Sequence, residues 1–247
     1  MRYFIRLAYR GINFHGWQSQ PNATSVQETI EKALSTVLRA ETKIVGAGRT
    51  DTGVNAAMMM AHFDSERKIP NPSILVRQLN SLVGKEIAIY SIFPVQDEAH
   101  ARFDATSRTY KYFAHTKKSP FLYSLSWFCH TPLDFELMNE AASKLLNYTD
   151  FTSFSKLHTD VMTNNCKITY AKWEKENDQW VFTITADRFL RNMVRAIVGT
   201  LVDIGRHKIT VDEFCKIIEK KDRCSAGTSM PGNALFLWNI TYPYPID

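Results

Sequence analysis

The sequence predicts an α+β protein of two similarly built halves, and three observations support this prediction. Strand-like and helix-like segments follow one another in a mixed order, without the regular alternation of a parallel βαβ protein. The two parts of the chain contain similar sets of segments, as a duplicated unit would. The 247 residues, 45% of them hydrophobic, suffice for a sizeable common core. We expect antiparallel sheets joined into one central sheet, helices packed outside and a cleft between the halves.

The first half starts with a strand over residues 2–9, where Tyr and aliphatic side chains alternate with a face that carries two arginines. Gly11 and Gly16 then punctuate a loop rich in bulky and polar groups. A capping box formed by Ser25 and Glu28 starts a helix that runs to Ala40. The rest of this half is expected to contain strands over 43–47 and 56–63, a helix over 73–82 and a strand over 86–95.

The second half is expected to begin in a long strand over residues 101–115, followed by a connection to residue 132. Further strands are expected over 166–176, 180–187 and 234–242, and helices over 134–147, 189–204 and 211–220. We place the domain boundary between residues 107 and 108, which gives halves of residues 1–107 and 108–247.

Composition narrows the classes of function. No apolar run is long enough for a membrane span and the N-terminus lacks the apolar stretch of a signal peptide, so we expect a soluble, cytoplasmic protein. The four cysteines show no metal-ligand spacing, which argues against a zinc site. A net charge of +5 is compatible with a polyanionic partner such as RNA.

The segment Gly46-Ala-Gly-Arg49-Thr50-Asp51-Thr52-Gly53 is the main candidate for chemistry. Its three glycines allow a tight turn and the close approach of a ligand, and one Arg and one Asp stand between them. The segment is also compatible with a plain turn whose aspartate caps neighbouring N–H groups. It lacks the residue order of a phosphate-binding P-loop.

With the segments around it, this loop resembles the tRNA pseudouridine synthase A family. The matching motifs occur in the family's order and span nearly the whole chain: Tyr9-x-Gly11, Phe14-x-Gly16, Val26-Gln27, GAGRTDTGVNA, His62-Phe63-Asp64, Asn80, HARFDA, Arg108-x-Tyr110-x-Tyr112, Asp150-Phe-Thr-Ser-Phe154 and Phe189-Leu190-x-x-Met193-Val194-Arg195-x-Ile197-x-Gly199-Thr200. The resemblance implies isomerisation of uridine to pseudouridine in tRNA, without a metal or organic cofactor.

The resemblance also implies roles for five residues. Asp51 matches the nucleophile, which attacks either the ribose C1′ or the base C6. Arg195 matches its cationic partner, whose charge lowers the pKa of a carboxylate. Arg49 matches the residue that displaces the target base, and Leu235 an apolar wall of the pocket. Tyr110 matches the tyrosine that stacks on that base, and its hydroxyl is also the candidate group that assists removal of the C5 proton.

This sequence departs from the family pattern at three places, of which the changes at Asn55 and Ala234 bear on substrate fit and on the choice of RNA target. The alanine after GRTD is Thr52, the histidine of GVHA is Asn55, and the C-terminal APxxGL motif is replaced by a segment containing Ala234. None of these changes removes a group that the implied chemistry requires.

The implied partner is tRNA, bound by a homodimer through the shape of its anticodon stem-loop and modified at uridines 38, 39 and 40. No DNA or membrane partner is expected. One alternative is a non-catalytic RNA-binding protein, which keeps Tyr110 and the basic face but does not need Asp51 beside Arg195. A second alternative is a phosphodiesterase that holds a metal with Asp51, His62 and Asp64, and a chelator would distinguish it.

Overall fold

The computed structural model describes residues 1–156 and 163–246, and it confirms the α+β class. The chain forms two compact units, each with its own strands and helices. Unit 1 comprises Met1–Thr106 and Leu237–Asp247, and unit 2 comprises Ser107–Phe236. Residues 237–247 thus belong to unit 1 by their contacts, although they follow the predicted boundary. The division into functional halves at residue 107 stays a prediction.

The strands of unit 1 pair in antiparallel fashion around β1 (Arg2–Tyr9). This strand lies between β3 (Asn55–Asp64) and β4 (Ile87–Val95), and β3 also pairs with the short β2 (Ile44–Gly46). The predicted alternation of β1 fails at Phe4, which is fully buried. The ring of Tyr242 covers Phe4 at a centroid distance of 5.6 Å.

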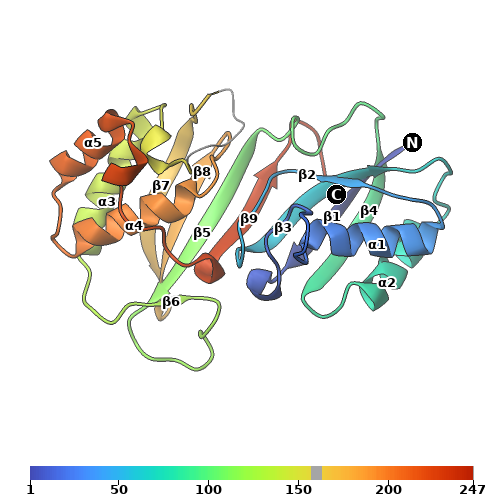
Figure 1. The fold of residues 1–247 in the computed structure, drawn as a ribbon, viewed down its shortest axis with the longest axis horizontal. Coiled ribbons are helices and arrows are strands. Elements are labelled where there is room, and N and C mark those ends of the chain that lie inside the picture. The colour runs from blue at the N-terminus through green and yellow to red at the C-terminus, as the bar shows by residue number, and fades with distance from the viewer. Residues whose placement is uncertain (157–162, 247) are drawn as a thin grey trace. The chain divides into compact units, whose positions relative to one another are not determined.

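Two helices, α1 (Val26–Leu38) and α2 (Pro72–Leu82), pack side by side against the strands of unit 1 (Figure 1). Ser25 caps α1, because its hydroxyl oxygen accepts the Glu28 N–H at 3.2 Å. Asn80 of α2 is bonded twice to Ile89 of β4: its amide N–H donates to the carbonyl oxygen and its amide oxygen accepts the backbone N–H, both at 2.8 Å. Asn80 therefore fixes the helix to the sheet.

Residues 101–106 do not belong to the strand that the sequence predicts over 101–115. The strand β5 begins at Ser107 and ends at His115. Before it, the Asp104 carboxylate accepts the His100 N–H at 2.7 Å, and the Asp104 N–H donates to the His100 carbonyl oxygen at 3.0 Å. These local bonds close a turn, and they satisfy backbone groups that a strand would have paired elsewhere.

In unit 2, β5 pairs antiparallel with β8 (Gln179–Ala186), and β8 pairs antiparallel with β7 (Ile168–Glu176). The short β6 (Trp127–Phe128) runs parallel to the end of β5. Three helices gather on one side of these strands (Figure 1): α3 (Phe135–Lys144), α4 (Met193–Gly205) and α5 (Val211–Lys220).

The helix α4 starts later than the predicted residue 189. Asn192, which precedes its first residue, has a left-handed φ of 67°, which no helical residue adopts. Phe189 to Arg191 therefore lie in the connection between β8 and α4. Most of α4 is buried, including Ile197, Val198 and Leu201, so this helix forms the core of unit 2.

The two units repeat one order of elements. A long first strand (β1, β5) is followed by a helix (α1, α3), then by two antiparallel strands (β2 and β3, β7 and β8), then by helical structure. In each unit the first strand pairs with the second strand of that hairpin. The strand β4 then follows in unit 1, whereas β9 (Leu235–Thr241), which follows the helices of unit 2 in the chain, lies mostly among the unit 1 residues 237–247. This order supports the predicted duplication.

Candidate active site

The loop that carries Arg49 and Asp51 connects β2 to β3 in unit 1. Its ends are fixed, because the Ala47 N–H donates to the Met60 carbonyl oxygen at 2.8 Å and the Val54 N–H to that of Asp51 at 3.1 Å. Gly53 adopts a φ of 77°, which completes the turn after Asp51. Asp51 is half-buried and Arg49 is exposed, so both side chains reach the surface of unit 1.

Backbone hydrogen bonds to residues 14–17 also fix the conformation of this loop. The Trp17 N–H donates to the Thr50 carbonyl oxygen at 3.2 Å, and the Gly53 N–H donates to the Phe14 carbonyl oxygen at 3.3 Å. Gly16 has a φ of 90°, and a Cβ there would lie 2.5 Å from the Thr50 carbonyl oxygen. A side chain at position 16 would therefore displace the residue that precedes Asp51.

Two buried hydrogen bonds that involve side chains connect the same loop and the start of β3 to residues 9–11. The Tyr9 and Thr50 hydroxyl groups are hydrogen-bonded at 2.8 Å. The Asn55 side-chain oxygen accepts the Gly11 N–H at 2.9 Å, and Asn55 is only 2% exposed. Asn55, one of the three departures from the family pattern, thus supports the backbone under the loop. The only signal for this role in the sequence is the motif glycine Gly11, whose backbone packs against that of Val54.

His62 and Asp64 have structural partners within unit 1. The His62 Nδ1 atom accepts the Ala101 N–H at 3.1 Å, and burial lowers the pKa of His62 to about 4. The Asp64 carboxylate accepts two hydrogen bonds from the Arg2 guanidinium, at 2.9 and 2.8 Å. Within residues 1–156 and 163–246, no three His, Cys, Asp or Glu side chains form a group that could hold a metal ion.

Unit 2 carries Tyr110 and Tyr112 on β5. Because they are two positions apart, with Lys111 between them, they point to the same face of the strand. Tyr110 is 9% exposed, and its ring meets that of Phe189 edge to face at a centroid distance of 5.1 Å. Tyr112 is fully buried, and this burial raises the pKa of its hydroxyl, while the nearby Arg195 charge acts in the opposite direction. The Tyr112 hydroxyl therefore stays neutral.

Arg195 lies in the first turn of α4 and is tied to Met230 at two points. Its side-chain Nε donates to the Met230 carbonyl oxygen at 2.6 Å, and the Met230 N–H donates to the Arg195 carbonyl oxygen at 3.1 Å. Arg195 is half-buried. A guanidinium held by Nε keeps a fixed orientation, which suits a group that pairs with an anion.

The segment before Met230 is itself fixed to α4. Ser229 accepts hydrogen bonds from the Asn192 side-chain amide at 2.6 Å and from the Arg223 guanidinium at 2.9 Å. The Gly227 N–H donates to the Thr200 hydroxyl at 2.9 Å. A Cβ on Gly199 would lie 1.8 Å from the Thr228 carbonyl oxygen. The motif residues Gly199 and Thr200 thus allow this segment to pack closely on α4.

Leu235 is 4% exposed at the start of β9, and the preceding Ala234 is fully buried. These values fit a wall of a pocket and a core position equally, so the role of Leu235 stays a prediction. The structure places Arg49 and Asp51 on one loop of unit 1, and Tyr110, Arg195 and Leu235 in unit 2. The functional roles of all five residues stay predictions.

Comparison with known proteins extends the resemblance to the whole chain. The family model described as tRNA pseudouridine synthase matches residues 7–104 and 141–243. A tRNA pseudouridine synthase A of Parabacteroides distasonis is 60% identical, over 100% of this chain and 99% of the relative. The enzyme of that name from Bacteroides fragilis is 58% identical, over 99% and 98% of the two chains. The one from Bacillus subtilis is 39% identical, over 98% and 99%.

Proposed function

The chain belongs to the tRNA pseudouridine synthase family, and on this basis we propose that it is an isomerase that converts uridine to pseudouridine in tRNA. The reaction breaks the N-glycosidic bond, turns the base and joins C5 of the base to C1′ of the ribose. The C5 proton is released and N1 takes up a proton, so the product is an isomer of uridine. No atom of the nucleoside framework is gained or lost. The non-catalytic RNA-binding alternative is not favoured, because the relatives with this similarity are named as synthases.

The observation that carries the proposal is the way in which the Asp51 loop is held. Its neighbours Thr50 and Gly53 are hydrogen-bonded to the backbone of residues 14–17, and Thr50 is also bonded to Tyr9. A nucleophile benefits from such support, because a fixed carboxylate needs little reorganisation when it attacks. We assign Asp51 as the nucleophile, with C1′ and C6 as the alternative points of attack.

The remaining roles follow from the resemblance and from the chemistry of each side chain. Arg195, oriented by Met230, is the cation that pairs with the anionic nucleophile. Arg49, exposed on the same loop as Asp51, takes the place of the displaced base. Tyr110 stacks on that base, and Leu235 contributes an apolar wall. No metal or organic cofactor enters this scheme.

The substrate must present its uridine outside the helical stack. Flipping a base out of a stem costs a few kcal/mol, and stacking on an aromatic ring offsets about 1–3 kcal/mol of that cost. We propose the anticodon stem-loop as the target, with uridines 38, 39 and 40 as the modified positions and a homodimer as the form that binds tRNA. A cytoplasmic location agrees with this substrate. No helix in the described part of the chain is long and apolar enough to span a membrane.

Mapping the product tests the proposal. An unmodified tRNA transcript with uridine at positions 38, 39 and 40 is incubated with the protein, and pseudouridine is located by chemical probing and reverse transcription. We expect modification at these positions only. Transcripts with cytidine at each position in turn serve as controls. Modification elsewhere would refute the assignment of positions, and no pseudouridine in any tRNA would favour the non-catalytic alternative.

A further inference from the structure

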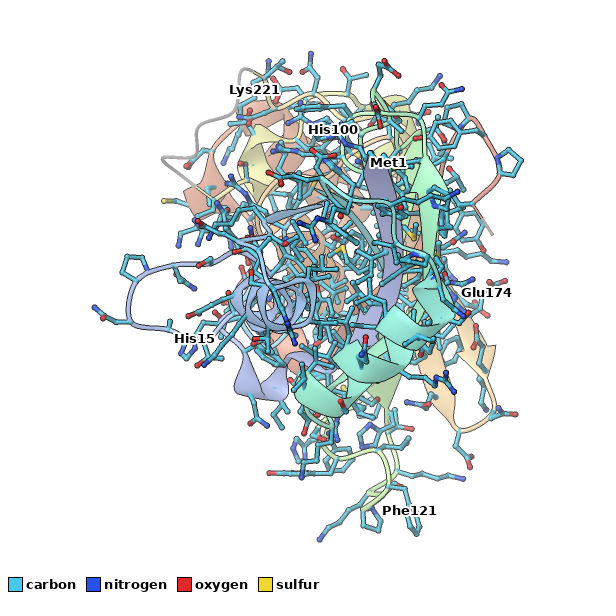
Figure 2. All side chains as sticks on the ribbon, turned by 90° about the vertical axis from the view of Figure 1, so that its right-hand side faces the viewer. Met1, His15, His100, Phe121, Glu174 and Lys221 are labelled. Carbon is cyan, nitrogen blue, oxygen red and sulfur yellow. The ribbon has the colours of Figure 1, made fainter. Side chains whose placement is uncertain are left out.

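The connection between β5 and β6, residues 116–126, presents aromatic side chains to solvent. Phe121 is 90% exposed and Tyr123 is 83% exposed, more than any other large hydrophobic side chain among the described residues. Figure 1 shows the loop extending past the end of β5, and in Figure 2 Phe121 lies at its tip, pointing away from the ribbon. We call residues 116–126 the aromatic loop.

Hydrogen bonds at its base and within it give the aromatic loop a defined conformation. At its base, the buried His115 Nδ1 and the Ser126 hydroxyl are hydrogen-bonded at 2.9 Å, and the Cys129 N–H donates to the His115 carbonyl oxygen at 2.8 Å. Within it, the Leu122 carbonyl oxygen accepts the N–H groups of Leu125 and Ser126, at 3.2 and 3.1 Å. These bonds define a turn that holds the rings of Phe121 and Tyr123 outward.

The charge of this region identifies the class of partner. Residues 105–133 contain no Asp or Glu, so the aromatic loop lies in the middle of a stretch without carboxylates. Lys117 and Lys118 are exposed, and neither has a carboxylate partner among the described residues. Exposed aromatic rings beside unpaired cations are the combination by which proteins bind single-stranded nucleic acid, because bases stack on the rings and phosphates attract the cations.

We propose that the aromatic loop is a second tRNA-binding element, in which Phe121 and Tyr123 stack on unpaired bases while Lys117 and Lys118 contact phosphates. The proposal rests on the proposed function, since it assumes a tRNA substrate. It adds a contact outside the residues that carry the chemistry. An apolar partner surface, such as a second copy of this chain, would match the rings but would leave the two lysines without anions.

Binding of unmodified tRNA to the full-length protein tests the proposal. The double variant Phe121→Ala/Tyr123→Ala is expected to raise the Kd about tenfold or more, since stacking is lost. Phe121→Trp is expected to keep tight binding, because a larger ring still stacks. Tyr90→Ala removes another exposed aromatic side chain, 57% exposed on β4, and is the matched control, with a Kd within about twofold of the wild type.

The lysines give a second readout. Lys117→Ala/Lys118→Ala is expected to lower the slope of log Kd against log salt concentration by about 1 to 2, because about one counterion is released for each phosphate contact. Thermal melts identify any variant that has lost its fold, and these side chains are exposed, so we expect melting temperatures close to that of the wild type.

Two results would overturn the proposal. The first is an unchanged Kd in the double aromatic variant, and the second is an unchanged salt slope in the double lysine variant. If the unchanged Kd comes with a halved mass in sedimentation, the aromatic loop is assigned to an interface between copies instead. The proposed function fails separately, through absence of pseudouridine formation by the wild-type protein.

Discussion

The hydrogen bond between Tyr9 and Thr50 provides a test of how the Asp51 loop is held. The two hydroxyl groups lie 2.8 Å apart, and the side chains are 4% and 8% exposed. Tyr9→Phe and Thr50→Val each remove one hydroxyl group and keep the shape of the side chain. Neither residue belongs to the proposed chemistry, so an effect on turnover would act through the position of the neighbouring Asp51.

The expected magnitude follows from burial. Removing one group of a buried hydrogen bond costs about 1–3 kcal/mol, because the other group loses that bond and gains no water in its place. Removing both costs much less than the sum, because no polar group of the pair is then left. We therefore expect each single variant to lower the free energy of unfolding by about 1–2 kcal/mol, with a coupling of roughly 1 kcal/mol in the double variant.

Urea unfolding of the wild type, the two single variants and the double variant measures this coupling. The rate of uridine conversion in a single turnover, measured on the same four proteins, reports the position of Asp51. We expect the rate to fall in each variant, since the loop loses a support. Additive effects on stability, within about 0.5 kcal/mol, together with wild-type rates, would refute the reasoning.

Two further predictions concern other supports of the site, and a third concerns the buried His62. Gly16→Ala is expected to destabilise the fold by about 1–3 kcal/mol and to slow turnover, because Gly16 has a φ of 90° and its Cβ would collide with Thr50. Gly48→Ala in the Asp51 loop is the control, because a Cβ there meets no atom within 4 Å. Wild-type stability in both glycine variants would contradict this. Ser229→Ala is expected to reduce the single-turnover rate about tenfold, because the segment that orients Arg195 loses two hydrogen bonds. Ser225→Ala, which removes a hydroxyl bonded to Asp222, is the control. Equal rates in the two serine variants would show that Arg195 does not depend on Ser229. Because burial lowers the pKa of His62 to about 4 from 6.5, the unfolded chain binds more protons between these values, so stability falls by at most about 3 kcal/mol as the pH drops through this range. Urea unfolding at several pH values should show a weaker dependence in His62→Gln, and an equal dependence would remove His62 as its source.

Local patterns in the sequence predicted much of the secondary structure. The strand over residues 2–9 and the helix over 211–220 agree with β1 and α5 at both ends, because side-chain periodicity is regular over both segments. The strand predicted over 101–115 begins later, at Ser107, because Asp104 binds the His100 N–H and closes a turn where the first residues of the strand were expected. The helix α5 starts with a complete capping box, in which Thr210 and Glu213 bond reciprocally, and the prediction of this helix makes no use of that signal.

The supports of the candidate site could not be predicted from the sequence. Tyr9 and Thr50 are 41 positions apart and meet only after β1 pairs with β3. Ser229 likewise touches Asn192, 37 positions away. The resemblance identified Gly11, Gly16 and Gly199 as motif residues, but the reason for each lies in the backbone that packs against it. A motif identifies the residues proposed to carry out the chemistry, whereas the contacts that position these residues depend on the fold.

The central claim is that Asp51 is the nucleophile of a metal-independent uridine isomerisation. Tritium release from tRNA that carries 5-³H-uridine reports the loss of the C5 proton. We compare the wild type, Asp51→Asn and the neighbouring exposed variant Thr52→Ala, all with EDTA present, and we measure tRNA affinity in parallel. The account predicts release by the wild type and by Thr52→Ala, and no release by Asp51→Asn despite a tRNA Kd within a few-fold of the wild type. Sustained release by Asp51→Asn, or loss of the wild-type activity on addition of EDTA, would contradict it.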